Sequence, residues 1–197
     1  MEKDNIQKML LEIGQKLVRV KGMEALTARK LAEASGCSVG AIYNQFSNMD
    51  NFVVVLNYMT LDALLQRLEK VPVTDDAHSD MNNLMKSFSE FVMQEKNLWF
   101  MLYNFYLRSG KQAYSYFYLR KIVRIVTIVS RIIERTLPDM EFPERMLSSQ
   151  ILWLTMFALS PFLASNTLGS MPKIKSATLC QIVLNTFVAG LSVLEKK

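Results

Sequence analysis

Thr27 and Ser38 are polar residues placed to begin two short helices, and a glycine turn lies between them. A Thr or Ser side chain at a helix start accepts one backbone N–H hydrogen bond, and the remaining free N–H groups can bind a phosphate. We expect helices over residues 28–34 and from 39 to about 44, joined by the turn Ser35-Gly36-Cys37, in which Gly36 supplies the left-handed conformation. The chemistry offered here is hydrogen bonding to a polyanion.

This pair of helices has one apolar side, and the second helix has a side that is free to point outward. Leu31, Cys37, Ile42 and Phe46 are apolar at positions that would pack the pair of helices on the preceding helix. The outward positions hold Val39, Gly40, Ala41, Tyr43 and Asn44. A helix of this size fits the DNA major groove with its N-terminal residues facing base edges. Residues 27–46 therefore predict a helix-turn-helix, in preference to a helical hairpin that happens to end in Tyr-x-x-Phe.

The rest of the chain is expected to be helical as well. Ile6, Met9, Leu10, Ile13 and Leu17 have the spacing of one buried helical face, and Lys21-Gly22 ends that first helix. A long helix is predicted from Asn48 to about Lys70, followed by helices near 78–95, 97–108, 112–136, 142–169 and 174–195. The chain has only 7 glycines and 5 prolines in 197 residues, and half of its residues are hydrophobic. Long apolar segments with few turn residues favour helices over sheets, so the predicted fold class is all-α.

Composition excludes several classes of protein. Two cysteines and one histidine provide neither a disulfide framework nor a zinc site. The sequence has no nucleophile–base pair, Gly-rich phosphate loop or metal-ligand spacing, so we expect no catalytic residues, no metal and no cofactor. The N-terminus is charged and amphipathic without a signal peptide, and the cysteine usage suits a reducing cytoplasm.

Two stretches without charged residues are long enough to span a membrane. They lie between Arg145 and Lys173 and between Lys175 and Glu195, and a membrane span needs about 20 residues. Both contain polar residues, among them Gln150, Ser160 and Asn185. Helices buried in protein–protein contacts are the favoured interpretation and no membrane partner is expected, although a membrane-anchored regulator stays an alternative.

The first sixty residues resemble the TetR family of bacterial transcriptional regulators. The residues that carry the resemblance are Gly22, Thr27, Ala32, Gly36-Cys37-Ser38, Gly40, Tyr43-Asn44-Gln45-Phe46 and Asn48-Met49-Asp50. They cover about a quarter of the chain at fixed spacing and without gaps. The resemblance implies a three-helix DNA-binding domain over residues 1–48 and a helical effector-binding and dimerisation domain over residues 49–197.

The resemblance also implies roles for individual residues. It makes Thr27 and Tyr43 phosphate contacts and Arg29 a base or phosphate contact, and it places Val39, Gly40, Ala41 and Asn44 on the reading face. Ser38 and Gln45 complete the expected DNA-binding set. Two positions depart from the family pattern, because Met49 stands where Lys is usual and Gln45 where His is usual. Losing one phosphate-binding Lys lowers affinity and flattens the salt dependence, so we expect modest operator affinity.

Aromatic residues are concentrated in one segment of the larger half. Nine aromatic residues, five of them Tyr, lie within 99–118. They indicate either a core in which hydroxyl groups reach water at the edges or a cavity for a small hydrophobic or aromatic effector. Arg120, Arg124, Arg131 and Arg135 follow one side of the next helix; a solvated face is favoured there, with contact to an anionic effector as the alternative. The expected effector pocket consists of Trp99, Tyr103, Tyr106, Tyr114, Phe117 and Arg124.

The last two predicted helices are apolar on too many sides for the surface of a monomer. We expect a subunit interface there, formed by Trp153, Phe157, Phe162, Ile182, Phe187 and Leu191. In the family, these helices pair with those of a second copy. A two-fold dimer would place its reading helices about 34 Å apart or somewhat more, which matches a palindromic operator on double-stranded DNA.

The sequence therefore predicts a ligand-responsive homodimeric repressor that binds DNA sequence-specifically. The alternative from another class is an effector-free protein-interaction or architectural module, in which Met49 and Gln45 mark weakened DNA binding. Sequence preference distinguishes the two, because an architectural module binds DNA weakly and without preference.

Overall fold

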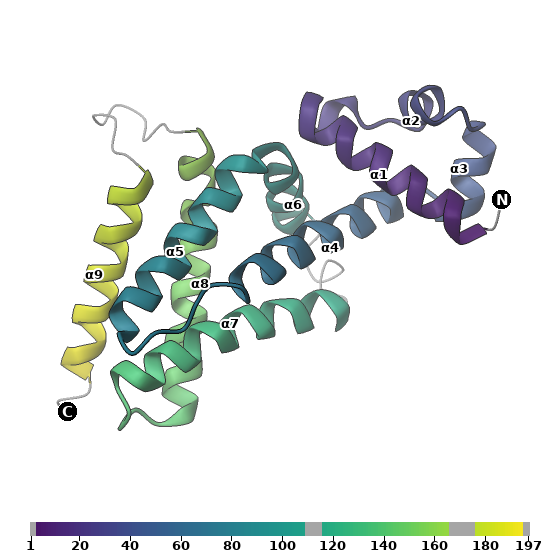
Figure 1. The fold of residues 1–197 in the computed structure, drawn as a ribbon. Helices are drawn as coiled ribbons and strands as arrows, with labels where there is room; N and C mark the ends of the chain where they lie inside the picture. Colours follow the sequence, from purple (N-terminus) through teal and green to yellow (C-terminus); the bar gives the residue numbers. More distant parts are fainter. Residues whose placement is uncertain (1–2, 109–115, 166–175, 195–197) are drawn as a thin grey trace. The chain divides into compact units, whose positions relative to one another are not determined.

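The structure is a computed structural model that describes residues 3–108, 116–165 and 176–194. Within these residues it contains helices and no strand (Figure 1), so the all-α prediction is confirmed. The elements are α1 (Lys3–Lys21), η1 (Met23–Ala25), α2 (Ala28–Ser35), α3 (Val39–Phe46), α4 (Met49–Leu68), α5 (Ala77–Gln94), α6 (Lys96–Arg108), α7 (Tyr116–Thr136), α8 (Phe142–Ser165) and α9 (Ser176–Leu194).

Local sequence explains where the first helices begin and end. Gly22 has φ 78° and ends α1, as its left-handed conformation permits. The short 3-10 helix η1 follows it, which the sequence reasoning did not predict. Asn48 precedes α4, and its side-chain oxygen accepts a hydrogen bond from the backbone N–H of Asn51 at 2.8 Å. Asn48 is therefore the cap that precedes α4, whereas the sequence predicts it as the first helical residue.

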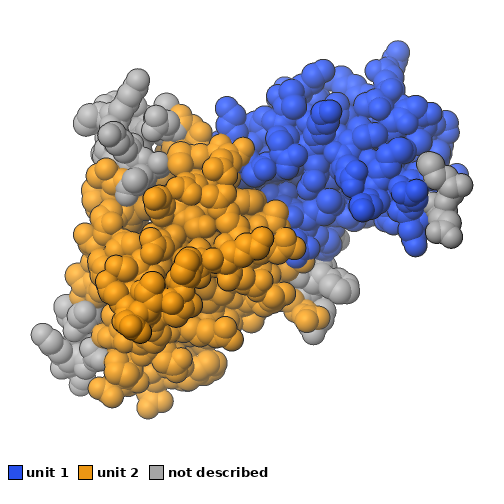
Figure 2. All heavy atoms as spheres, in the orientation of Figure 1, with its two compact units in different colours: residues 1–62, 95–117 blue, residues 63–94, 118–197 orange. Residues whose placement is uncertain are grey.

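The chain forms two compact units (Figure 2). Unit 1 comprises residues 1–62 and 95–117, and unit 2 comprises residues 63–94 and 118–197. Packing thus assigns most of α4 and the whole of α6 to the unit that holds the helix-turn-helix. The boundary expected after residue 48 separates DNA binding from effector binding and stays a proposal. It does not coincide with the division by packing.

Unit 1 is organised around α1, which packs against α2, α3 and α6. Its core contains Leu10, Leu31, Ile42 and Phe52, none of which is exposed to solvent. The rings of Phe46, at the end of α3, and Phe52, at the start of α4, meet edge to face with 4.7 Å between their centroids. Gly14 of α1 lies directly against Phe52, because a Cβ at Gly14 would be 2.6 Å from two ring carbons. The glycine therefore allows α1 and α4 to approach closely.

Unit 2 is a helical bundle in which α5, α8 and α9 lie side by side. Phe88 of α5 and Trp153 of α8 meet edge to face with 5.9 Å between their ring centroids. The last turn of α4 is attached to α5 by Arg67, which donates to Ser87, Glu90 and Gln94 at distances of 3.3, 2.8 and 2.6 Å. This fork of hydrogen bonds fixes the end of α4 within unit 2.

One described helix, α8, is long and apolar enough to cross a membrane by length and composition alone. A core helix of a soluble protein passes the same test, and 44% of the apolar window of α8 is buried within the protein. A single helix of this kind is weak support for a membrane span.

We predict that Gly14→Ala destabilises the protein and that Gly190→Ala does not. Alanine is favoured over glycine inside a helix by about 0.5–1 kcal/mol. At Gly14 this gain is outweighed by overpacking against the buried ring of Phe52, which typically costs about 1–3 kcal/mol. Gly190, inside α9, has nothing within 4 Å of the added Cβ and provides the matched control. Urea unfolding of both variants checks this, and equal stability of the two would contradict the close approach of α1 and α4.

Candidate DNA-binding site

The helix-turn-helix consists of α2 and α3, and both helices are capped as their sequences predict. Thr27 Oγ1 accepts a hydrogen bond from the backbone N–H of Lys30 at 3.2 Å, and Ser38 Oγ accepts one from Ala41 at 3.1 Å. Gly36 ends α2 with φ 70°, and its N–H donates to Ala32 O at 2.9 Å. The caps leave other N–H groups of each first turn without a partner inside the helix, as a phosphate contact requires.

The two sides of α3 differ sharply in burial. Ile42 and Phe46 are buried in the core of unit 1. Val39 and Tyr43 are 38% and 42% exposed. Gly40 and Asn44 are exposed as well, whereas Ala41 and Gln45 are half-buried. We call Val39, Gly40, Tyr43 and Asn44 the outer face of α3.

Charge at this surface is sparse. Arg29 is largely exposed and pairs with Glu33, one turn further along α2, with 3.3 Å between Nε and the carboxylate oxygen. An exposed pair of this kind contributes little to stability in water, so the guanidinium can exchange its partner for a phosphate or a guanine. The sequence reasoning overlooked Glu33, although its spacing of four residues from Arg29 signals the pair. It also overlooked Lys30, an exposed cation on the same helix.

Met49 and Cys37 are explained by packing. Both side chains are half-buried and contact the core of unit 1. Met49 thus brings apolar contact to the start of α4 where a lysine would bring a charge. Cys37 likewise serves as a small apolar residue in the turn.

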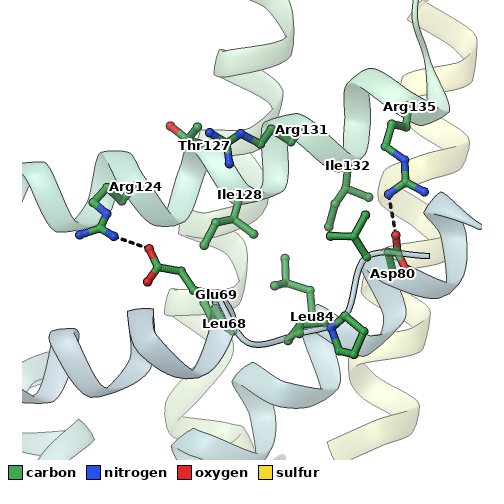
Figure 3. A pocket seen from close by; sticks show the side chains of 13 residues that line it. Leu68, Glu69, Asp80, Leu84, Arg124, Thr127, Ile128, Arg131, Ile132 and Arg135 are labelled. Atoms are coloured by element: carbon green, nitrogen blue, oxygen red, sulfur yellow. Dashed lines mark hydrogen bonds and ion pairs between the residues drawn. The ribbon is translucent and has the colours of Figure 1, made fainter. Parts of the chain in front are cut away.

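A cavity of about 560 Å³ lies within unit 2 (Figure 3). One wall is α7, and the facing wall is formed by the end of α4, the segment 71–73 and α5. Its apolar lining is aliphatic, and its charged residues are Glu69, Asp80, Arg124, Arg131 and Arg135. The volume lies within the range of roughly 300–1,000 Å³ that is usual for small-molecule sites.

Of the expected effector residues, Arg124 alone lines this cavity. Trp99 is fully buried, and Tyr103 and Tyr106 are half-buried, all three on α6 in unit 1. Tyr114 and the side chain of Phe117 lie outside the described residues. An aromatic lining is therefore wrong for this cavity, because its apolar side chains are the leucines, isoleucines, valines and proline of α4, α5, α7 and segment 71–73.

Asp80 closes one end of the cavity. Its side chain is 3% exposed, and it accepts hydrogen bonds from Arg135 Nη1 at 2.6 Å, from the Thr74 hydroxyl at 2.7 Å and from the Thr74 N–H at 3.0 Å. Arg135 also donates to Thr74 O. These bonds, chiefly that of Arg135, hold the pKa of Asp80 below its ordinary value of 3.8. The cluster attaches the chain between α4 and α5 to α7.

The residues expected at a subunit interface divide into two groups. Trp153, Phe157 and Leu191 are buried in the subunit's own core. Their expected place at a subunit interface is therefore corrected. Phe187 is half-buried. Phe162 and Ile182 are exposed. The exposed apolar side of α8 consists instead of Leu147, Ile151, Leu154 and Phe162. Periodicity had marked α8 as apolar all round without showing which side its neighbours cover.

Metal ligation has no support in the described part of the chain. Within residues 3–108, 116–165 and 176–194, no three His, Cys, Asp or Glu side chains are grouped as a metal site requires.

Comparison with known proteins identifies the N-terminal region. A family model described as bacterial regulatory proteins of the tetR family matches residues 10–56. No curated protein matches the sequence.

Solved structures match almost the whole chain at low sequence identity. A protein of unknown function from Rhodococcus sp. has 17% identity and a TM-score of 0.73, covering 94% of each chain. A tetR-family transcriptional regulator from Streptomyces coelicolor has 16% identity and a TM-score of 0.72, covering 98% of this chain and 83% of its own. The TetR family transcriptional regulator PfmR from Thermus thermophilus has 17% identity and a TM-score of 0.64, covering 92% and 98%. At these identities the likeness shows a shared fold.

We predict that Asp80→Asn lowers the melting temperature at neutral pH and reduces its dependence on acid pH. Because the pKa of Asp80 is lowered in the folded state, its contribution to stability is present above pH 3.8 and is lost as the pH falls through the lower folded value. Thermal unfolding from pH 7 to pH 2 checks this, with Asp75→Asn, in the segment just before α5, as control. An unchanged acid profile in Asp80→Asn would contradict the assigned ion pair.

We predict that Met49→Lys tightens DNA binding at low salt and steepens its salt dependence. One added phosphate contact changes the slope of log K against log salt by about −0.9. Binding to one duplex at several salt concentrations measures this. Ala34→Lys, at an exposed position of α2, controls for the added charge alone. Equal slopes for the wild type and Met49→Lys would show that the start of α4 does not meet the phosphate backbone.

Proposed function

We propose that the chain is a regulator of the bacterial tetR family, whose model matches residues 10–56, and that it is a homodimeric repressor whose DNA binding a small effector relieves. The observation that carries this proposal is the outer face of α3. It exposes Val39, Tyr43 and Asn44 beside two capped helix starts, while the opposite side of α3 is anchored in the core. We assign the chain no catalytic role. Since its target is chromosomal DNA, the proposed setting is the cytoplasm.

The types of the exposed side chains suggest how an operator is read. Asn44 has the two groups that pair with an adenine edge in the major groove. Val39 and Ala41 can contact a thymine methyl group, and Gly40 lets the helix approach the bases closely. Thr27, Ser38 and Tyr43, with Arg29 released from Glu33, bind the flanking phosphates. Gln45 is half-buried and contributes less than its exposed neighbours.

The exposed apolar side of α8 supports the proposed dimer. Leu147, Ile151, Leu154 and Phe162 follow one another at spacings of one to two helical turns and are each more than two-fifths exposed. Ile182, on the neighbouring α9, is exposed as well. Exposed apolar side chains in such a row are covered most simply by the same surface of a second copy.

The cavity in unit 2 is the proposed effector site. Leu68 and Glu69, which line it, lie at and just after the last turn of the helix that begins directly after the helix-turn-helix. An effector that binds more tightly to one position of this helix end than to another changes the affinity for the operator. The operator then changes the affinity for the effector by the same factor.

Selection of DNA fragments by the purified protein at about 150 mM salt tests the proposed function, because non-specific binding is weak there. We expect enrichment of a palindrome with half-sites about 34–36 Å apart or somewhat more. Enrichment of a single, non-palindromic half-site would contradict the dimer. No enrichment, even at low salt, would overturn sequence-specific regulation and favour the interaction-module alternative. Met49 supports that alternative because it stands where a phosphate-binding lysine is usual.

We predict that Leu154→Glu converts the dimer into a monomer, because a carboxylate in an apolar interface is desolvated without a partner. Light scattering after size-exclusion chromatography measures the mass. Leu107→Glu, at an exposed leucine of α6, is the control and should leave the mass unchanged. A dimeric mass for Leu154→Glu would place the interface elsewhere.

A further inference from the structure

The cavity in unit 2 carries its positive charge on one wall. Arg124, Arg131 and Arg135 all project from α7 and all line the cavity (Figure 3). Positions 131 and 135 are one turn apart, and 124 and 131 are about two turns apart. The three guanidinium groups therefore share one side of the helix, together with Thr127, Ile128 and Ile132.

Two of these arginines are neutralised by the facing wall. Arg124 pairs with Glu69, and Arg135 pairs with the buried Asp80 at 2.6 Å. Arg131 forms no ion pair with another described residue, and its side chain is exposed. The cavity thus has three cations and two anions, and the uncompensated charge is that of Arg131, between the two ion pairs.

Apart from Thr127, the uncharged part of the lining is apolar. Leu68 and Leu84 are buried, and Val71, Ile128 and Ile132 continue the same surface. Branched aliphatic side chains of this kind attract a ligand by the hydrophobic effect and offer no hydrogen bonds that would fix a polar body. A ligand that matches both features has an apolar body and a single anionic group.

We propose that this cavity binds an amphipathic organic anion, whose anionic group pairs with Arg131 and whose apolar body lies against Leu84, Ile128 and Ile132. A cationic amphiphile meets a net positive wall and is repelled. A neutral amphiphile gains the apolar contacts alone. The proposal deepens the proposed effector function and rests on it only for the consequence that binding has for DNA.

The test uses three ten-carbon probes that differ in charge, namely decanoate, decanol and decyltrimethylammonium. Isothermal titration calorimetry at concentrations below micelle formation measures their binding to the full chain without DNA. We expect decanoate to bind about tenfold more tightly than decanol, the difference that one charge-assisted hydrogen bond to an exposed group gives. The cationic probe should bind more weakly than decanol.

Matched variants place the anion. Arg131→Gln should bring decanoate to the affinity of decanol and leave decanol unchanged. Arg120→Gln, at an exposed arginine of the same helix that does not line the cavity, should leave both affinities unchanged. Since Arg131 is exposed, the substitution should not alter the fold, which circular dichroism of the variant checks.

Several results would overturn the proposal. They are equal affinity of decanoate and decanol for the wild type, an unchanged preference in Arg131→Gln, and no binding of decanoate. A DNA-binding measurement with decanoate separates this proposal from the proposed function. Charge-dependent binding that leaves DNA affinity unchanged supports the ligand class and contradicts effector control.

Discussion

The edge-to-face contact between Phe46 and Phe52 is the interaction on which the DNA-binding unit depends. Phe46 ends α3, Phe52 lies in the first turn of α4, and both rings are buried with 4.7 Å between their centroids. Gly14 lets α1 close over the same ring. One packed aromatic pair thus joins α3 to α4, and α1 packs against the same pair.

This constraint explains why so few residues of α3 are available for recognition. Burying Ile42 and Phe46 commits one side of a two-turn helix to the core, so that the outer face is left with Val39, Gly40, Tyr43 and Asn44. The same requirement for apolar contact accounts for Met49 at the start of α4. Charge is sparse at this surface, whereas Arg124, Arg131 and Arg135 line a cavity in unit 2.

The fold could be predicted because its signals are local. Helix caps at Thr27 and Ser38, the turn at Gly36 and the spacing of apolar residues act over a few positions, and the structure places the described α-helices close to where these indicate. The effector and interface residues depend on packing between distant helices. Sequence could not show that Trp153 would face Phe88 within the subunit, that Arg135 would meet Asp80 fifty-five positions away, or that aliphatic residues would line the cavity.

The central claim is that the outer face of α3 reads base edges. The most direct measurement is selection of DNA fragments in parallel by the wild type and by Asn44→Ala, an exposed substitution that leaves the core untouched. Each lost base contact costs about 1–3 kcal/mol at its own position. The account predicts that Asn44→Ala loses preference at one or two positions of each half-site and keeps the remainder of the sequence. An identical selected sequence would contradict it.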